Sequence, residues 1–375
     1  MRINQSPLPT GSANCQYSLT SFHYGQAGGK KVYLQASLHA DELPGMLVLH
    51  HLRPMLAQAE AEGRLQCEIV VVPVANPIGL GQTFMHDQMG RFDFASGTNF
   101  NRSFPDLSDR LIALLADSLG DDAQRNVQLI RTGIRQLLDA AECRTPLDAM
   151  RIGLMRLAHD ADIVLDLHCD CEAVLHIYAS SDHVAEAELL GRYLRARVIL
   201  IADAIGGACF DEMLFKPWLR LRDHFGAQFP VLQPCFASTV ELRGEQDVSH
   251  QFASTDAHGI YHFLCSSGMI ADVTSVTSDA PEAVCVPTPL TGSVTVYAGV
   301  AGVISYVARP GDVLKLGDAV CDIVDPLTGC SYTVKSPIDG VMYSRVVFRY
   351  ATRGMELAKI AGSIEKRSGG DLLGP

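Results

Sequence analysis

The strongest constraint on the fold is a strand, a helix and a second strand near the start of the chain. Residues 31–38 form an apolar run that predicts a strand, and Pro44-Gly45-Met46 then opens a helix that extends to about Ala61, before Gly63. A β-branched apolar run follows at 68–74. Because this run has no polar face, it predicts a strand buried on both sides, as in a βαβ unit of a parallel sheet.

Further apolar runs continue this pattern along the chain. They predict four more strands and two more helices, namely strands at 162–168, 176–179, 198–201 and 238–242 and helices at 184–195 and 255–266.

Two intervening stretches differ from this pattern. Residues 80–106 are rich in glycine and have no clear period, so they predict a long loop. Residues 107–159 have a helical period, with one amphipathic helix over 111–119 and another over 127–138.

The amino-acid composition of the sequence changes after residue 265. Serine, threonine, aspartate and proline dominate up to residue 289, as in a linker. Short strands then alternate with glycine turns, and a weak repeat relates the stretch from Gly302 to the stretch from Gly340. We therefore expect an α/β domain over 1–275, a linker over 276–290, and a small, quasi-symmetric all-β barrel domain over 291–365.

Composition narrows the class of protein. The chain has 375 residues, 47% hydrophobic and 19% charged, which is enough for two folded domains. Its net charge of −12 argues against a nucleic-acid or membrane-surface partner. The N-terminus has no signal-peptide core, and no apolar run reaches the roughly 18 residues of a membrane span. Eleven cysteines without a framework indicate reduced thiols, so a cytoplasmic location is expected.

Three side chains at expected strand ends have the chemistry of a zinc site. His39 and Glu42 lie three residues apart after the first strand, and His168 ends the strand 162–168. A catalytic zinc ion needs three such protein ligands and an open position for water. Since the carboxyl ends of parallel strands share one edge of a sheet, the three side chains can meet there. The alternative for His168 is a core histidine bonded to a backbone carbonyl.

Two carboxylates lie near this expected site. Asp166 shares a strand face with His168 and can hold the second N–H of a ligand histidine. Glu241 ends the strand 238–242 and is the best candidate for a general base that takes a proton from a zinc-activated water. The alternatives are a bond from Asp166 to a neighbouring loop and an exposed strand end for Glu241.

The loop 80–106 offers groups that bind a carboxylate. Asn101 and Arg102 place an amide beside a guanidinium, which can hold a substrate carboxylate through several hydrogen bonds. Arg91 is a second cation in this loop and could stabilise the oxyanion of a tetrahedral intermediate. The alternative for each arginine is a plain surface charge. Cys169 and Cys171 leave a thiolate zinc site open, although cysteine is also common in cores.

Four motifs resemble, in this order, the succinylglutamate desuccinylase/aspartoacylase family, which is related to the zinc carboxypeptidases. The resemblance covers about residues 20–265. The motifs are Ser37-Leu38-His39-Ala40-Asp41-Glu42, Ser96-Gly97-Thr98-Asn99-Phe100-Asn101-Arg102-Ser103-Phe104-Pro105, Leu165-Asp166-Leu167-His168 and Val240-Glu241-Leu242.

The resemblance implies an α/β fold with a mixed, largely parallel sheet flanked by helices. It also implies one zinc ion per chain, with His39, Glu42 and His168 as ligands. By the same motifs, Glu241 is expected to be the general base and Asn101 with Arg102 the clamp for the substrate carboxylate. Arg91 aligns loosely with the carbonyl-polarising arginine of the family. Ala40 stands where the family usually has glycine, and the helical stretch 107–159 looks like an insertion that reshapes the pocket mouth.

The C-terminal region resembles the biotinyl/lipoyl barrel that many members carry. Carrier domains present a lysine at a hairpin tip, which here would be Asp325-Pro326-Leu327-Thr328-Gly329. No lysine lies between Leu316 and Val334, so neither lipoate nor biotin is expected. The barrel is expected to cover the mouth of the active site or to contribute to a homo-oligomer.

These patterns predict a zinc-dependent amidohydrolase that removes an acetyl- or succinyl-type group from an N-acylated amino acid or a related small carboxylate. A carboxypeptidase that acts on short peptides is a second hypothesis, because the same ligands and clamp would serve it. A third is a zinc-stabilised binding module without catalysis, in which Cys169 or Cys171 supplies a fourth ligand.

Overall fold

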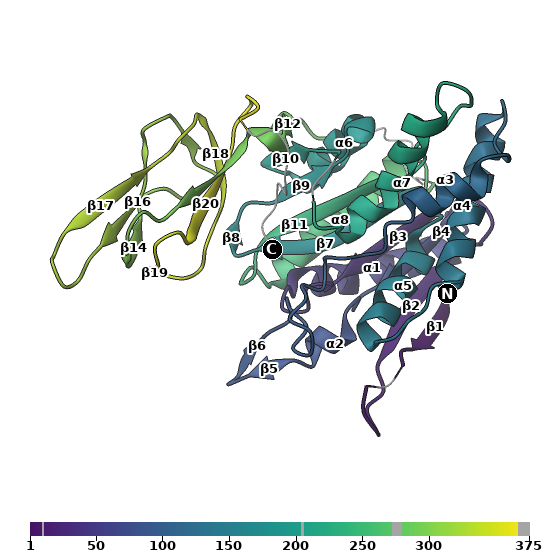
Figure 1. Ribbon diagram of the computed structural model, residues 1–375, viewed down its shortest axis with the longest axis horizontal. Helices are drawn as coiled ribbons and strands as arrows, with labels where there is room; N and C mark the ends of the chain where they lie inside the picture. Colours follow the sequence, from purple (N-terminus) through teal and green to yellow (C-terminus); the bar gives the residue numbers. More distant parts are fainter. Residues whose placement is uncertain (10, 204–205, 272–279, 367–375) are drawn as a thin grey trace.

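The computed structural model of the chain describes residues 1–9, 11–203, 206–271 and 280–366. Most of these residues build one large sheet with helices on both faces, and the C-terminal strands extend to one side of it (Figure 1). In spatial order, the large sheet consists of β1 (Arg2–Pro7), β2 (Ser18–Tyr24), β4 (Glu68–Val72), β3 (Lys31–Ala36), β7 (Ile163–Asp170), β11 (Phe236–Gly244), β9 (His176–Ala179), β10 (Val198–Ile201) and β12 (Thr288–Pro289).

The central strands of this sheet are parallel. β3 pairs in parallel with β4 and with β7, and β7 pairs in parallel with β11. β9 runs antiparallel to β11, while β1 and β2 form an antiparallel edge next to β4. The expected mixed, largely parallel sheet is therefore confirmed.

Helices cover both faces of the sheet because its strands are apolar on both faces. In β3, Tyr33 contributes to the core on one face, whereas Val32 and Leu34 contribute to the core on the other. The first face is covered by α3 (Ser108–Leu115), α4 (Ala123–Asp139), α5 (Pro146–Ala158) and α7 (Phe210–Phe225), and the second by α1 (Pro44–Ala61), α6 (Val184–Leu194) and α8 (His250–Ser266).

Strands β1 and β2 and helix α7 are absent from the expected elements. All six residues of β1 are exposed, so the strand has no apolar alternation that would reveal it. In α7, Pro217 interrupts an otherwise amphipathic stretch, although ten of its residues, including Trp218, are buried.

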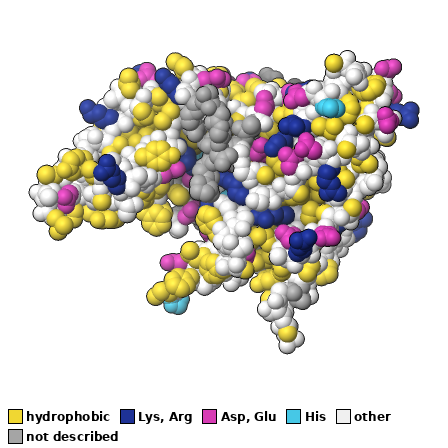
Figure 2. Space-filling model, in the orientation of Figure 1, with side chains coloured by type: hydrophobic (Ala, Val, Ile, Leu, Met, Phe, Trp, Pro, Cys, Tyr) yellow, Lys and Arg dark blue, Asp and Glu magenta, His cyan; other side chains and the backbone are white. Residues whose placement is uncertain are grey.

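The expected loop 80–106 contains short ordered elements. The helix α2 (Pro77–Leu80) precedes it, and the strands β5 (Thr83–Phe84) and β6 (Asp87–Gln88) form a hairpin within it. Phe84 and Met85 at this hairpin are 62% and 79% exposed, and the space-filling view shows hydrophobic side chains on the projection that the hairpin forms (Figure 2).

The C-terminal strands form two antiparallel sheets. Part of the expected linker 276–290 lies outside the described residues, and its end forms β12 of the large sheet and the start of the short helix η2 (Leu290–Gly292). The first sheet is β13 (Ser293–Tyr297), β20 (Glu356–Ala361), β18 (Gly340–Arg345) and β15 (Val313–Leu314), and the second is β17 (Ser331–Lys335), β16 (Ala319–Val324), β14 (Gly302–Tyr306) and β19 (Tyr350–Ala351).

The repeat in the sequence corresponds to a repeat in this structure. Gly302 at the start of β14 lies against the backbone of Val324, where a Cβ atom would come within 2.4 Å of the carbonyl oxygen. Gly340 at the start of β18 meets Ala361 in the same way, at 2.3 Å. Both positions therefore exclude a side chain, and β14 with β16 matches β18 with β20.

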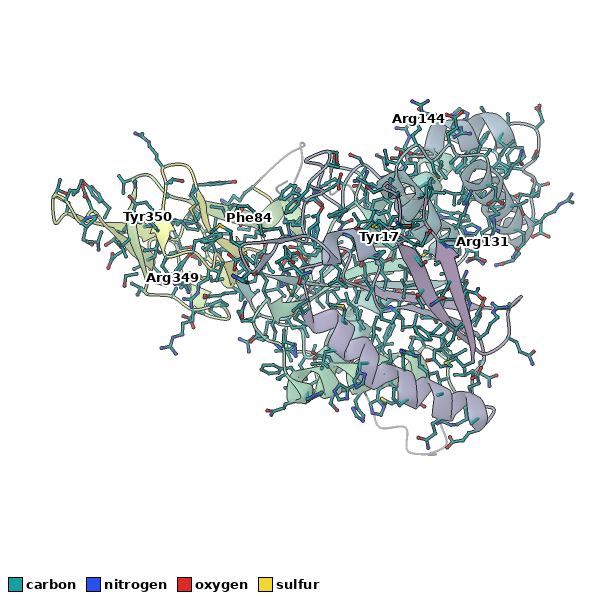
Figure 3. All side chains as sticks on the ribbon, turned by 90° about the horizontal axis from the view of Figure 1, so that it is seen from below. Tyr17, Phe84, Arg131, Arg144, Arg349 and Tyr350 are labelled. Carbon is teal, nitrogen blue, oxygen red and sulfur yellow. The ribbon has the colours of Figure 1, made fainter. Side chains whose placement is uncertain are left out.

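The C-terminal sheets are attached to the large sheet beside the end of β7. The two-residue strand β8 (Glu172–Ala173) pairs with β18, and Glu172 forms ion pairs with Arg345 and Arg349. Figure 3 shows from below that the C-terminal region, which carries Arg349 and Tyr350, projects from the α/β body. None of the helices in the described ranges combines the length and the apolar character of a membrane span.

Candidate metal centre and active site

The backbone brings the predicted zinc ligands to one edge of the sheet. His39 and Glu42 lie in the turn between β3 and α1, and His168 lies near the carboxyl end of the neighbouring strand β7. Gly45 allows α1 to pack closely on these strands, because a Cβ atom there would lie 2.9 Å from the Cβ atoms of Ala36 and Leu167. The sequence-predicted juxtaposition of two strand ends therefore follows from direct β3–β7 pairing.

His39, Glu42 and His168 converge on one point. The two carboxylate oxygens of Glu42 lie 2.7 Å from Nδ1 of His39 and 2.7 Å from Nδ1 of His168. One potential ligand atom from each residue lies within 4.8 Å of the others, and all three residues are buried. Two imidazole nitrogens and a carboxylate oxygen are a donor set that suits zinc.

The outer nitrogen of each histidine faces a fixed polar partner. Nε2 of His39 lies 2.9 Å from Oδ1 of Asn99, and Nε2 of His168 lies 3.0 Å from Oδ2 of Asp166. Since an amide or carboxylate oxygen only accepts, these partners would keep the proton on each Nε2 when a metal is bound, which would leave the lone pair of each Nδ1 for the metal. Gln35 in turn donates from Nε2 to Oδ1 of Asp166, at 2.9 Å.

Asp166 thus lies beside His168, and Asn99, which the sequence did not single out, lies beside His39. It belongs to the motif that contains Asn101 and Arg102, and only the fold shows that its side chain faces His39. Arg151 of α5 supports this loop by donating from Nη2 to the backbone oxygen of Asn99, at 2.9 Å.

The charges of the three candidate ligands depend on one another. Burial lowers the pKa of His39 to about 4, despite the opposing effect of Glu42. Burial would also lower the pKa of His168, but Asp166 and Glu42 outweigh it and raise this pKa well above 6.5. Burial would raise the pKa of Glu42, whereas the two histidines lower it well below its usual range. Without a metal, one imidazolium therefore balances Glu42.

Glu241 lies beside the candidate ligands on β11. Its neighbours across the sheet are His168 on β7 and His176 on β9. Burial, together with the negative charge of Glu42, raises the pKa of Glu241 to about 8. Its Oε2 atom is buried and has no hydrogen-bond partner among the described residues. Glu241 is therefore not an exposed strand end and has an oxygen available for a small molecule.

The predicted loop residues lie around the same point. Arg91 places Nη1 3.3 Å from Oε1 of Glu42 and 3.3 Å from Nδ1 of His39. Arg102 donates from Nη1 to the backbone oxygen of Asn101, at 2.8 Å. Asn101 is buried, and its Oδ1 accepts a hydrogen bond from the backbone N–H of Phe210, the first residue of α7, at 2.9 Å. The amide oxygen of Asn101 is thus already engaged within the protein.

These residues surround one cavity of about 400 Å³, called here the central cavity. The C-terminal region supplies part of its wall, and no residue of the helical stretch 107–159 lines it. Its lining residues are His39, Glu42, Arg91, Asn101, Arg102, His168, Cys169, Asp170, Cys171, Tyr178, Cys209, Asp211, Thr239, Glu241, Glu245, Val346, Phe348, Glu356 and Lys359.

The cysteines beside His168 do not join the metal-ligand group. Among the described residues, the group of histidine, cysteine and acidic side chains close enough to share an ion consists of His39, Glu42 and His168. Burial raises the pKa of the Cys169 thiol far above its usual range and that of Cys171 to about 12. All eleven cysteines of the chain are free thiols.

The chain resembles known proteins in sequence and in fold. Residues 28–132 match the family model of the succinylglutamate desuccinylase/aspartoacylase catalytic domain. This stretch contains His39, Glu42, Arg91, Asn101 and Arg102. A search of curated proteins found no match.

Solved structures share the fold over nearly the whole chain. A succinylglutamate desuccinylase/aspartoacylase family protein from Shewanella amazonensis SB2B has a TM-score of 0.84 at 24% identity, with 96% of this chain and 98% of that chain covered. A protein from Shewanella frigidimarina NCIMB 400, described in the same way, has a TM-score of 0.83 at 24% identity, with 96% of each chain covered. The ectoine utilization protein EutE (DoeB) from Ruegeria pomeroyi, in a product-bound structure, has a TM-score of 0.64 at 16% identity, with 95% and 92% covered.

Fold and site together define an α/β protein with a buried His-Glu-His group at the carboxyl edge of a mixed sheet. The resemblance seen in the motifs is thereby confirmed: residues 28–132 match the catalytic-domain model of the succinylglutamate desuccinylase/aspartoacylase family, and solved structures described as members share the fold.

Proposed function

We propose that this protein is a zinc-dependent amidohydrolase that removes an acyl group from an N-acylated amino acid or a related small carboxylate. The observation that carries the proposal is the convergence of His39, Glu42 and His168 in a cavity whose wall also holds Glu241. The donor set suits zinc, and Asn99 and Asp166 would hold a proton on each Nε2 and so leave the two Nδ1 lone pairs to the ion.

Different side chains around this site would carry out proton transfer, stabilisation of the oxyanion and substrate binding. Bound zinc would lower the pKa of a water molecule and polarise the acyl carbonyl. Glu241 would accept a proton from this water and later deliver it to the leaving amine. Arg91, close to Glu42, would stabilise negative charge on the carbonyl oxygen, while Arg102 would bind the substrate carboxylate.

The structure favours this function over the two alternatives. A carboxypeptidase must admit a peptide, whereas the central cavity measures about 400 Å³ and Val346 and Phe348 of the C-terminal region form part of its wall. A closed zinc site in a binding module requires a fourth protein ligand. Neither Cys169 nor Cys171 belongs to the group that could hold the ion.

The proposal is tested with purified protein and a Glu241→Gln variant. We expect about one zinc ion per chain and hydrolysis of N-acetyl or N-succinyl amino acids in preference to short peptides. Glu241→Gln should lower turnover by about 10²- to 10⁴-fold and leave zinc bound, because it removes the proton acceptor and keeps the ligands. Glu186→Gln, on the exposed side of α6, is the matched control. Near-normal turnover in Glu241→Gln, or folded protein that retains no zinc, would contradict the proposal.

A further inference from the structure

Four histidines lie close together on the helices α1 and α8, apart from the candidate active site. His50 and His51 belong to α1, and His250 and His258 belong to α8. His51 is half-buried, and the other three are exposed. None of these four described residues lines the central cavity, so the proposed function does not use them.

One ring nitrogen of His51 directly faces one ring nitrogen of His250. Nε2 of His51 lies 2.9 Å from Nδ1 of His250, and the ring centres are 5.2 Å apart with the ring planes at 85°. Because zinc–nitrogen bonds measure about 2.0–2.1 Å, two neighbouring imidazole ligands of one ion have their nitrogens about 3 Å apart. The two facing nitrogens therefore already have the separation that chelation of one ion requires.

Both facing nitrogens can offer a lone pair to an ion at the same time. In the metal-free protein, one of the two histidines donates the proton that lies between the rings. A neutral imidazole can carry its single proton on either nitrogen, so this histidine can hold the proton on its outer nitrogen instead. An ion would then take the place of the hydrogen bond, and a neutral pair would release no proton.

The neighbouring imidazoles favour the neutral, metal-binding form of His51. Burial, and then the positive charges of His250, His50 and His258, lower the pKa of His51. His258 is thus within electrostatic reach of His51. Nδ1 of His258 lies 2.7 Å from the backbone oxygen of Ser254. Since this oxygen only accepts, neutral His258 keeps its proton on Nδ1 and the lone pair of its Nε2 remains available.

The packing of the two helices holds the facing histidines in place. Leu52, next to His51, and Ala253, three residues after His250, are buried in the same core beneath α1 and α8. The side chain of Ser249 caps α8 immediately before His250. The backbone positions of both histidines are therefore fixed without an ion, which reduces the cost of ordering them when an ion binds.

We propose that His51 and His250 form a second metal site, which binds a divalent transition-metal ion of the Cu²⁺, Ni²⁺ and Zn²⁺ class and links α1 to α8. Imidazole nitrogens suit these ions, and water would complete the coordination shell at this exposed position. Cu²⁺ should bind most tightly, because affinity for nitrogen ligands is highest for this ion. The site goes beyond the proposed function and does not depend on it.

Calorimetric titration of Ni²⁺ into the untagged, zinc-loaded full chain tests the site. We expect one Ni²⁺ ion to bind per chain. His51→Ala and His250→Ala should each weaken this binding by about tenfold or more, because each variant leaves only one of the two facing nitrogens. His224→Ala, which removes an exposed histidine near the end of α7, is the control and should bind Ni²⁺ normally.

The outcome of this titration is separate from that of the proposed function. Zinc content, measured on the same samples, reports on the central cavity, whereas the loss of Ni²⁺ binding in the two variants reports on the second site. A wild-type chain that binds no Ni²⁺, or equal Ni²⁺ affinity in the wild type and both site variants, would overturn the inference and leave the proposed function intact.

Thermal unfolding measures whether the ion links the two helices. An ion that bridges α1 and α8 binds the folded state and stabilises it, because the two histidines separate when the chain unfolds. Saturating Ni²⁺ should raise the unfolding midpoint of the wild type and of His224→Ala, and should leave that of His51→Ala unchanged. Midpoints without Ni²⁺ show whether a substitution itself affects folding. An equal rise in His51→Ala would exclude the bridge.

Electron paramagnetic resonance with one equivalent of Cu²⁺ identifies the ligands directly. The wild-type spectrum should show coupling to at least two imidazole nitrogens, and the His250→Ala spectrum to fewer. Identical spectra from the two proteins would exclude His250 as a ligand and overturn the inference.

Discussion

At the scale of single residues, Asn99 and Asp166 face the outer nitrogens of the two histidines and would determine which nitrogen of each binds a metal. Replacing Asp166 with Asn, or Asn99 with Ala, should weaken zinc affinity by about 10- to 100-fold and leave the three ligands in place. Competition with a coloured chelator measures this affinity. Gln16→Ala is a control that should bind zinc normally, because Gln16 lies outside the site and its side chain donates to the backbone oxygens of Leu8 and Tyr17. Unchanged affinity in both site variants would show that the outer hydrogen bonds do not orient the ligands.

The pH dependence of zinc binding follows from the same residues. A ligand must lose its proton before it binds a metal. In the metal-free protein the pKa of His168 is raised well above 6.5 by Asp166 and Glu42 against the effect of burial, whereas that of His39 is lowered to about 4. At neutral pH, zinc should therefore displace about one proton, from His168. Calorimetry in buffers of different ionisation enthalpy counts this proton.

Protonation of His168 should change the stability of the metal-free protein and its zinc affinity in opposite directions as pH rises. Because the folded-state pKa of His168 is raised, its contribution to the stability of the metal-free protein is complete below about pH 6.5 and is lost as pH rises through the higher, folded value. Zinc affinity, in contrast, should increase about tenfold for each unit that pH rises, until His168 is deprotonated. Affinity that is flat between pH 6 and 8 would contradict the charge assigned to His168.

At the scale of elements, Asn101 connects the loop 80–106 to helix α7. The N-cap residue of α7, Cys209, makes no capping hydrogen bond, and Oδ1 of Asn101 accepts from Phe210 instead. Asn101→Ala should therefore lower the free energy of unfolding by about 1 kcal/mol. Asn101→Asp keeps the acceptor and should restore stability, yet weaken substrate binding because it adds negative charge beside Arg102. Chemical denaturation and KM separate the two effects, and equal stability of all three proteins would exclude the capping role.

The sequence predicts those strands whose burial on both faces produces a continuous apolar run. Strands β3, β4, β7 and β11 are buried on both faces, so their apolar runs are visible, and the turn after β3 carries its ligands within four residues. Strand β1 is exposed along its whole length and gives no such signal. The partner of His39, Asn99, is 60 residues away, and local sequence does not reveal such a contact. The wall that β20 contributes to the cavity is equally invisible before the fold is known.

At the scale of the whole molecule, a largely buried ion pair, Lys359 with Asp170, joins the C-terminal region to strand β7, which carries His168. Lys359 and Asp170 retain only 20% and 15% of their side-chain exposure, so removing one partner leaves a poorly hydrated charge. Lys359→Met should lower the free energy of unfolding by about 3 kcal/mol or more. Lys315→Met, which breaks a pair whose side chains are 73% and 62% exposed, should have no measurable effect. Thermal unfolding compares them, and equal midpoints would mean that the pair does not join the two parts.

The two copies of the repeat in the C-terminal region differ in their contribution to the central cavity. The copy that starts at Gly340 contains β18, which pairs with β8, and β20, which supplies Glu356 and Lys359 to the cavity. The copy that starts at Gly302 contributes no cavity residue in the described part of the chain, and β14, β16 and β17 lie toward the outer end of the molecule (Figure 1). Mutational tolerance should therefore split along the duplication. Substitutions in the outer copy should be tolerated when its own packing is kept. Substitutions in the inner copy should in addition be limited by the substrate that the cavity binds.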